Sequence, residues 1–311
     1  MYNDFFGFRT NPFSPNPDPR FLFFTPEIEE ALACLTYGVQ TGKGFVLMTG
    51  EVGTGKTTII NMLLEWLEAQ HAATSFVFNS RLNEDQFLDF MMADFGITCD
   101  SHSKSQLLLC LNDWLLERHR AGEKAVLIVD EAQNLSSEVL EELRLLTNLE
   151  TFTAKLLQIV LVGQPELEYK LKQPHHRQLL QRITLRVKTQ PLDLEQTRRY
   201  IAQRLRLAGS NGTRIFADET FPAIHCHSQG IPRLVNLLCE HALINAFVEQ
   251  KKEISLAMID EVAGEFELKA NLSLVSEPGL SANLRFRAQA AEVAYSTELN
   301  TGTENIPERK L

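Results

Sequence analysis

The sequence predicts an α/β protein with an open, doubly wound parallel sheet, followed by a helical domain. Three observations support this prediction. Short, near-continuous apolar runs alternate with longer amphipathic segments, a glycine-rich stretch directly follows the first strand-like run, and no strong strand-like run remains after Pro191. Strands that are buried on both faces read as continuous apolar runs, and parallel strands need helical crossovers between them.

Residues 1–25 form an aromatic and proline-rich arm. Its prolines prevent a long helix, and its phenylalanines make it too apolar for a free tail. We therefore expect it to pack on the body of the protein as an extended arm. A helix should follow over residues 26–40, with Pro26 in its first turn.

Residues 26–190 should form the α/β domain. The apolar runs in this segment predict five strands, at residues 45–49, 75–79, 125–130, 156–163 and 183–189. Amphipathic helices should lie between them, including residues 59–70 and 136–150. Ser136 or Ser137 is the expected N-cap of the second of these helices.

Residues 191–267 should form an all-helical domain, with helical patterns at residues 193–209, 217–229, 232–250 and 255–268. Beyond it, residues 268–311 lose periodicity and gain Ser, Asn, Thr, Pro and Glu. This composition indicates a mostly disordered tail, with one short helix around residues 285–295. We expect the tail to be dispensable for folding.

Composition narrows the class of protein. With 311 residues, a hydrophobic content of 44% and a charged content of 23%, the chain is typical of a globular protein with a substantial core. Its net charge of −10 counts against a broad basic surface for nucleic acid.

No secretory signal is recognisable, and no apolar run reaches the roughly 18 residues that a membrane helix needs. The five dispersed cysteines suggest buried thiols in a reducing compartment. We therefore expect a cytoplasmic protein that reaches a membrane only through a partner.

The glycine-rich stretch GEVGTGKTT matches the phosphate-binding pattern G-x-x-x-x-G-K-[ST] between a strand and a helix. Glycines allow backbone N–H groups to surround an anion, and the helix adds its positive end. Lys56 should reach the β- and γ-phosphates of ATP, and Thr57 should ligate Mg²⁺. The alternative is a glycine-rich turn that only joins strand to helix. The expected binding residues are Gly50, Glu51, Val52, Gly53, Thr54, Gly55, Lys56, Thr57 and Thr58.

A second element, AVLIVDEAQ, ends a strand-like run with two carboxylates. Asp130 occupies the position of a carboxylate that holds the water shell of Mg²⁺. Glu131 follows it and is the expected base that polarises the attacking water. The alternative is a pair of surface carboxylates at a strand end. Together with the glycine-rich loop, the pair favours ATP hydrolysis over passive nucleotide binding.

At these motifs the sequence resembles the AAA+ ATPases. The segments YNDFFGFRTNPFSPNPDPRFLF, GFVLMTGEVGTGKTT, LIVDEAQNLSSEVLEELRLLTNLET, LLQIVLVGQPEL, RQLLQRI and GIPRLVNLLCEHAL resemble the general secretion pathway protein A (ExeA) type and its MSHA-pilus and exosortase-linked relatives. The resemblance spans roughly residues 1–267. Secretion-type members often carry a membrane helix and a peptidoglycan-binding domain after the ATPase. Because neither is present here, we expect a shorter pilus or polysaccharide relative.

The resemblance implies further roles for single residues. Gln164 is at the position of the polar sensor for the γ-phosphate, and its alternative is a strand-end residue that starts a turn. Arg182 is at the position of an arginine finger that acts in a neighbouring subunit, with Arg177 as a substitute; the alternative is a surface ion pair. Arg233 is at the position of the second sensor at the start of a lid helix, although a solvated first-turn arginine is the other reading.

The resemblance also places the aromatic arm, with Phe13, Pro17 and Pro19, near the adenine, while plain hydrophobic packing would explain it equally well. Two other signals are interpreted as structural. The soft ligands of His225-Cys226-His227 with Cys239 and His241 lack metal-site spacing. The basic run RRYIAQRLR is expected to be a solvated helix.

The sequence thus predicts a Mg²⁺-dependent AAA+ ATPase that hydrolyses ATP at a subunit interface of a homo-oligomeric ring. Its helical lid, residues 191–267, should move to act on a protein partner in secretion, pilus assembly or exopolysaccharide export. The rival class is a nucleic-acid-associated AAA+ regulator such as a transposition helper. The net charge of −10 counts against that class. A scaffold with negligible turnover is a third possibility, disfavoured by Glu131.

Overall fold

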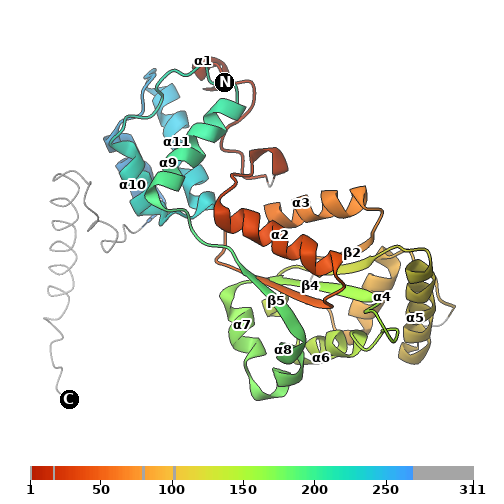
Figure 1. Ribbon diagram of the computed structural model, residues 1–311. Coiled ribbons are helices and arrows are strands. Elements are labelled where there is room, and N and C mark those ends of the chain that lie inside the picture. The colour runs from red at the N-terminus through yellow and green to blue at the C-terminus, as the bar shows by residue number, and fades with distance from the viewer. Residues whose placement is uncertain (1, 17, 79–80, 101–102, 269–311) are drawn as a thin grey trace, which may run out of the picture. The chain divides into compact units, whose positions relative to one another are not determined.

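The computed structural model describes residues 2–16, 18–78, 81–100 and 103–268 of the chain. These residues form two compact units (Figure 1). One is the segment Asn16–Pro191, which we call the α/β unit. The other joins Met1–Pro15 to the chain from Leu192 onward, and we call it the helical unit. The predicted disordered tail, Leu268 excepted, and the short helix at residues 285–295 lie outside the described residues.

The α/β unit contains a five-stranded sheet in the order β2-β3-β4-β1-β5, and every neighbouring pair of strands is parallel. This arrangement confirms the predicted fold class. The strands span Phe45–Thr49 (β1), Ala73–Val77 (β2), Ala125–Val129 (β3), Leu157–Gly163 (β4) and Ile183–Lys188 (β5).

Helices cover both faces of this sheet, and the central strands β1, β3 and β4 are therefore buried at every position and mostly apolar. Phe45 and Leu47 of β1 belong to one core cluster, while Val46 and Met48 belong to the other. Helices α2 (Pro26–Gln40) and α3 (Lys56–Ala69) supply the second cluster. The first cluster contains residues of α4 (Glu84–Asp94), α5 (Lys104–Arg120), α6 (Ser137–Leu146), α7 (Pro165–Leu171) and α8 (Arg177–Arg182).

Capping residues fix where the helices begin. Pro26 is at the first position of α2, and the Thr25 hydroxyl accepts a hydrogen bond from the helix. Of the two candidate serines before α6, Ser136 is the N-cap, and its hydroxyl accepts from the backbone N–H of Val139. Short 3-10 helices η1 (Pro19–Phe21), η2 (Ala132–Asn134) and η3 (Pro174–His176) complete this unit.

Strand β2 begins and ends two residues earlier than the sequence indicated. Its register is set by β3, with Ala73 opposite Ala125 and Val77 opposite Val129. Phe78, which the pattern placed inside the strand, follows it and is 65% exposed. The apolar run was misleading there because Phe78 packs edge-on against the ring of Phe90 instead of entering the core.

The helical unit is built from α1 (Tyr2–Phe6), α9 (Leu194–Leu207), α10 (Thr220–Ser228), α11 (Pro232–Val248) and α12 (Leu256–Glu265) (Figure 1). Gly230, in the turn before α11, has a φ of 69°, and an added Cβ would collide with the backbone of Leu192. A glycine is therefore required at this close approach.

The first 15 residues are part of the helical unit, not one extended arm of 25 residues. Tyr2 opens a short helix, and its hydroxyl donates to the carboxylate of Glu240 at 2.8 Å, while burial raises the pKa of the phenol. The guanidinium of Arg204 donates to the carbonyl of Pro12 at 2.8 Å. Phe13 is 1% exposed. Apolar and polar contacts together hold this segment in place.

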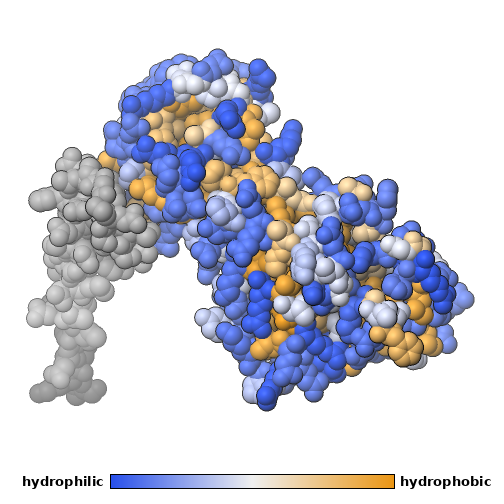
Figure 2. Space-filling view, in the orientation of Figure 1, coloured by the Kyte–Doolittle hydropathy of each residue, from blue (hydrophilic) through white to orange (hydrophobic). Residues whose placement is uncertain are grey.

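Surface and cysteine chemistry differ in part from expectation. Hydrophilic residues cover most of the visible face of each unit (Figure 2). Among the helices that the structure describes, none combines the length and apolar character needed to cross a membrane. Cys226 and Cys239 are buried as expected, whereas Cys99 and Cys110 form a disulfide that the dispersed spacing did not reveal.

Candidate nucleotide-binding site

Three segments meet at the carboxyl ends of the strands. They lie at the point in the sheet where the chain, having started at β1, has placed β5 on one side of that strand and the other strands on the opposite side. Gly50 follows β1, Asp130 follows β3 and Gln164 follows β4, and these three strands are neighbours. The backbone N–H of Gly50 donates to the carbonyl of Gly163 at 3.2 Å, which holds two of the segments together. In open α/β sheets this edge is where ligands bind.

The glycine-rich loop has the backbone of an anion cradle. Gly53 and Gly55 have φ angles of 85° and 94°, which glycine adopts without strain. A Cβ at Gly50 would collide with Thr189 at the end of β5. Helix α3 begins at Lys56 with no side-chain cap on its first N–H groups in the described structure. The loop therefore fits a polyphosphate, because uncapped N–H groups at a helix start are donors for an anion.

Threonines brace the loop and line its outer side. The Thr54 hydroxyl lies 2.8 Å from the carbonyl of Glu51 and 2.6 Å from the hydroxyl of Thr189. Thr57 is exposed and Thr58 is half-buried. Exposure at Thr57 is compatible with the metal-ligand role that the sequence motif predicts, and that role stays a prediction.

Lys56 is the cation of the site. It is 7% exposed, and its Nζ donates to the carbonyls of Gly50 and Glu51 at 2.8 and 2.9 Å. Burial lowers the pKa of the amine, and the carboxylates of Glu131 and Asp130 act in the opposite direction. Burial therefore weakens, and the neighbouring carboxylates strengthen, the preference of this amine for its charged form.

The two predicted carboxylates, Asp130 and Glu131, lie in different environments. Asp130 is 8% exposed, and burial, chiefly, raises the pKa of its carboxyl. Its Oδ1 accepts the backbone N–H of Glu131 at 2.8 Å. Glu131 has a left-handed backbone with φ 51° and ψ 35°. That conformation costs a non-glycine residue about 1 kcal/mol, and such strain is found at functional sites.

Amide groups surround the carboxylate of Glu131. Its Oε2 accepts from the side chain of Gln133 at 2.5 Å and from that of Gln164 at 3.2 Å. The structure therefore brings the predicted sensor Gln164 and the predicted base Glu131 into direct contact, although β3 and β4 supply them from different parts of the sequence.

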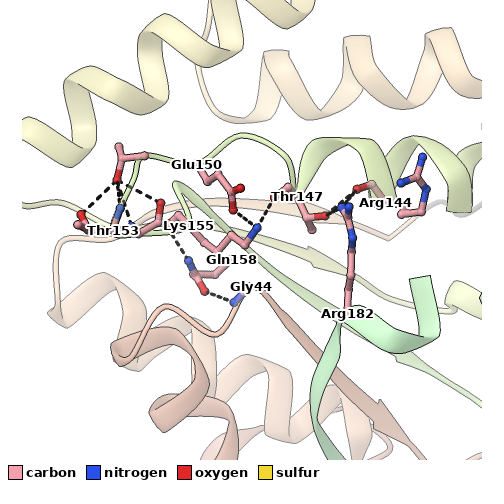
Figure 3. A network of polar contacts seen from close by, with 10 residues as sticks. Gly44, Arg144, Thr147, Glu150, Thr153, Lys155, Gln158 and Arg182 are labelled. Atoms are coloured by element: carbon pink, nitrogen blue, oxygen red, sulfur yellow. Dashed lines mark hydrogen bonds and ion pairs between the residues drawn. The ribbon is translucent and has the colours of Figure 1, made fainter. Parts of the chain in front are cut away.

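Arg182 lies at the opposite end of the strands from the glycine-rich loop, at the amino end of β5. It ends α8, directly before Ile183, which is opposite Phe45 at the beginning of β1. Its guanidinium donates to the carbonyl of Arg144, at 2.6 Å, and to the hydroxyl of Thr147 (Figure 3). Arg182 is thus held within its own unit, and it is not part of the cluster around Lys56.

Arg233 and the aromatic arm belong to other surroundings. Arg233 is exposed in the first turn of α11 in the helical unit, and Arg177 is exposed at the start of α8. Phe13 is buried in the helical unit, where its ring is 6.2 Å from that of Phe216. Pro19 begins η1 of the α/β unit, and Pro17 lies outside the described residues.

The signals interpreted as structural have structural partners. Nε2 of His227 is 3.2 Å from the carboxylate of Asp260, and Cys226 and Cys239 are buried. In the described part of the chain no group of three or more His, Cys, Asp or Glu residues could hold a metal ion. The basic helix α9 differs from the prediction at one position, because Arg204 is buried rather than solvated.

Sequence reasoning missed three residues that shape the site. Gln133 binds Glu131, Thr189 touches the glycine-rich loop, and Lys170 donates to the carbonyls of Gln133 and Leu135. Only Gln133 carried a signal in the sequence, since it follows Glu131 by two residues. Thr189 directly follows β5 and Lys170 is in α7, and their contacts depend on the folded sheet.

Comparisons with known proteins agree with this geometry. Residues 39–171 match the AAA domain family. General secretion pathway protein A of Aeromonas hydrophila is 46% identical over 255 residues, which cover 82% of this chain and 46% of that protein. The chain thus spans about half the length of this relative.

Solved structures share the fold at low identity. Cdc6p of Pyrobaculum aerophilum has a TM-score of 0.65 and 18% identity, over 86% of this chain and 74% of that one. The ORC2 protein of Aeropyrum pernix has a TM-score of 0.61 and 16% identity, over 87% and 76%. The sheet order, the glycine-rich loop and the extended similarity to general secretion pathway protein A lead to one assignment. The chain belongs to the AAA+ ATPase family, in the group of the ExeA type.

Proposed function

We propose that this chain binds and hydrolyses ATP with Mg²⁺. The observation that carries the proposal is the meeting of the anion cradle, Lys56 and the strained Glu131 at one edge of the sheet. A cradle without a base would serve binding alone. The carboxylate directly after Asp130 adds the group that hydrolysis requires.

Each residue has a role that follows from its contacts. The N–H groups of Glu51 to Thr58 would hold the phosphates, and Lys56 would exchange its carbonyl partners for phosphate oxygens. Thr57 and Asp130 would hold Mg²⁺, which neutralises charge on the phosphates when bound. Glu131 would accept a proton from the attacking water, and Gln164 would contact the γ-phosphate.

The helical unit and Arg182 extend the proposal beyond one site. We assign the segment of residues 191–267 as a lid that carries Arg233 to the nucleotide, and Arg182 as a finger for a neighbouring subunit. Arg182 lies at the sheet edge opposite the glycine-rich loop, which supports action outside its own chain. A homo-oligomeric ring follows from this assignment.

The biological setting proposed is assembly of a cell-envelope system, with a membrane-bound protein partner and a cytoplasmic or peripheral location. Similarity to general secretion pathway protein A over 82% of the chain supports this setting. A nucleic-acid-associated regulator is the second candidate, because such a regulator would have a similar glycine-rich loop and helical lid. The net charge of −10 disfavours it.

Phosphate release with Mg²⁺ and ATP tests the proposal. Wild type should turn over, while Lys56→Ala should not bind nucleotide and Glu131→Gln should bind without turnover. Lys251→Ala, an exposed lysine of the helical unit, is the matched control and should behave as wild type. Absence of turnover in wild type at any protein concentration would refute hydrolysis. Strong stimulation by DNA would favour the second candidate.

A mixing experiment tests the assembly. Arg182→Ala retains an intact loop and Lys56→Ala retains an intact arginine, so a mixed ring contains some complete interfaces. Activity that returns on mixing supports the finger in trans. A turnover rate that does not depend on protein concentration, with no rescue on mixing, would exclude it.

A further inference from the structure

Gln133 connects the proposed base to the end of strand β4. Its side-chain Nε2 donates to Oε2 of Glu131 at 2.5 Å. Its Oε1 accepts the backbone N–H of Gln164 at 3.1 Å. One amide group therefore links Glu131, after β3, to Gln164, after β4, and these two residues are 33 positions apart in the chain.

The chemistry of the two partners fixes the orientation of this amide. A carboxylate accepts hydrogen bonds, whereas a backbone N–H donates one. Only one of the two orientations of the Gln133 amide satisfies both partners, because the reversed amide would present oxygen to oxygen and N–H to N–H. The contact is therefore specific for an amide of glutamine length.

The surroundings hold Gln133 in place. Lys170 of α7 donates to its backbone carbonyl at 3.3 Å and also to the carbonyl of Leu135. Gly163 leaves the room for its side chain, since a Cβ at Gly163 would lie 2.8 Å from Oε1 of Gln133. That separation is shorter than real Cβ contacts, so any larger residue at this position would displace the amide.

Both amide donors bind the same oxygen of the carboxylate. Gln133 and Gln164 each donate to Oε2 of Glu131, at 2.5 and 3.2 Å. In the described structure this arrangement leaves Oε1 for a water molecule. Because one oxygen is fixed by two donors, the direction of the other oxygen is fixed as well.

We propose that Gln133 is a positioning residue that aims the carboxylate of Glu131 and ties its direction to the end of β4. The inference rests on the proposed ATP hydrolysis, since the base it positions belongs to that reaction. Gln133 touches Glu131 rather than the nucleotide. Its loss should therefore lower kcat and leave nucleotide affinity unchanged.

Two substitutions separate hydrogen bonding from volume. Gln133→Met retains the length of the side chain and removes both hydrogen bonds. Gln133→Glu retains an acceptor for Gln164 but places a second carboxylate against Glu131. We expect each to reduce kcat about 10- to 100-fold, the effect of one lost charge-assisted hydrogen bond at a reacting group. KM for ATP and binding of a nonhydrolysable ATP analogue should stay within about 2-fold.

The matched control is Asn134→Met, which makes the same kind of change at the exposed neighbouring residue and should retain wild-type kcat. The double variant Glu131→Gln with Gln133→Met should bind the ATP analogue and melt as Glu131→Gln alone does, because the base to be positioned is absent. A purely structural residue would add its own loss, and it would lower analogue binding and the melting temperature.

The outcomes distinguish this inference from the proposed function. If wild type turns over, Glu131→Gln is inactive and Gln133→Met has wild-type kcat, the positioning role is refuted and ATP hydrolysis stands. Equal losses of kcat and analogue affinity in Gln133→Met would also refute it. A wild type without turnover would refute the proposed hydrolysis and this role together.

Discussion

Replacing Arg182 with alanine should destabilise the α/β unit in addition to any effect on turnover. The guanidinium donates to the carbonyl of Arg144 and to the hydroxyl of Thr147 (Figure 3). Helix α6 ends at Leu146, so the carbonyl of Arg144 is among the last four, which have no partner within the helix. The hydroxyl of Thr147 also donates to this carbonyl, at 2.6 Å, so Arg182 is its second side-chain donor and binds the threonine as well.

The magnitude follows from these two contacts. A hydrogen bond from a charged donor contributes roughly 1.5–3 kcal/mol. Because the guanidinium is partly exposed, we assign about 2 kcal/mol to its two hydrogen bonds together. For a unit of this size, about 1 kcal/mol shifts the melting temperature by about 2–4 °C. Arg182→Ala should therefore melt about 4–8 °C below wild type.

Thermal denaturation followed by circular dichroism measures this effect. Arg177→Ala is the control, because Arg177 is exposed in the same helix. Thr147→Val should lower the melting temperature by a smaller amount and should be less than additive with Arg182→Ala, since the two share a contact. If Arg182→Ala has the same melting temperature as wild type, the capping role is refuted. Turnover of this variant must be measured well below its own melting temperature to isolate the finger.

Three further outcomes are expected. Lys56→Ala should lose ATP binding in a fluorescence titration with a nucleotide analogue, because it removes the buried cation of the loop; retained affinity would contradict the cradle. Glu131→Gln should bind ATP normally and show no phosphate release in a coupled assay, since an amide cannot accept the proton of the water; turnover at the wild-type rate would remove Glu131 from the mechanism. The pKa of His176 is lowered chiefly by burial and further by His175 and Lys170. The imidazole therefore binds a proton less readily in the folded state than in the unfolded state. The free energy of unfolding should therefore fall as the pH decreases below about 6.5, and His176→Gln should flatten this dependence in urea melts. Equal pH slopes for the two proteins would count against it.

The sheet could be predicted from the sequence because each central strand is a nearly continuous apolar run that is buried on both faces. Helix starts were also readable, since Pro26 and Ser136 act locally. The predicted bounds of the edge strand β2 lie two residues too far along the chain. Its true limits depend on pairing with β3, which no local pattern encodes.

The site was predictable where chemistry and sequence spacing coincide, as in the glycine-rich loop and Asp130–Glu131. The contacts of Gln133 and Arg182 were not, because their partners lie 31 and 38 residues away. The disulfide between Cys99 and Cys110 also depends on folding, which brings two cysteines 11 residues apart into contact.

The left-handed backbone of Glu131 has a consequence for attempts to evolve a sturdier variant. Glycine would adopt this conformation without strain, so a screen for heat resistance alone should enrich Glu131→Gly. Such a variant would have lost the carboxylate that the proposed reaction needs. Stability and activity therefore compete at this single position, and libraries for thermostabilisation should hold it constant.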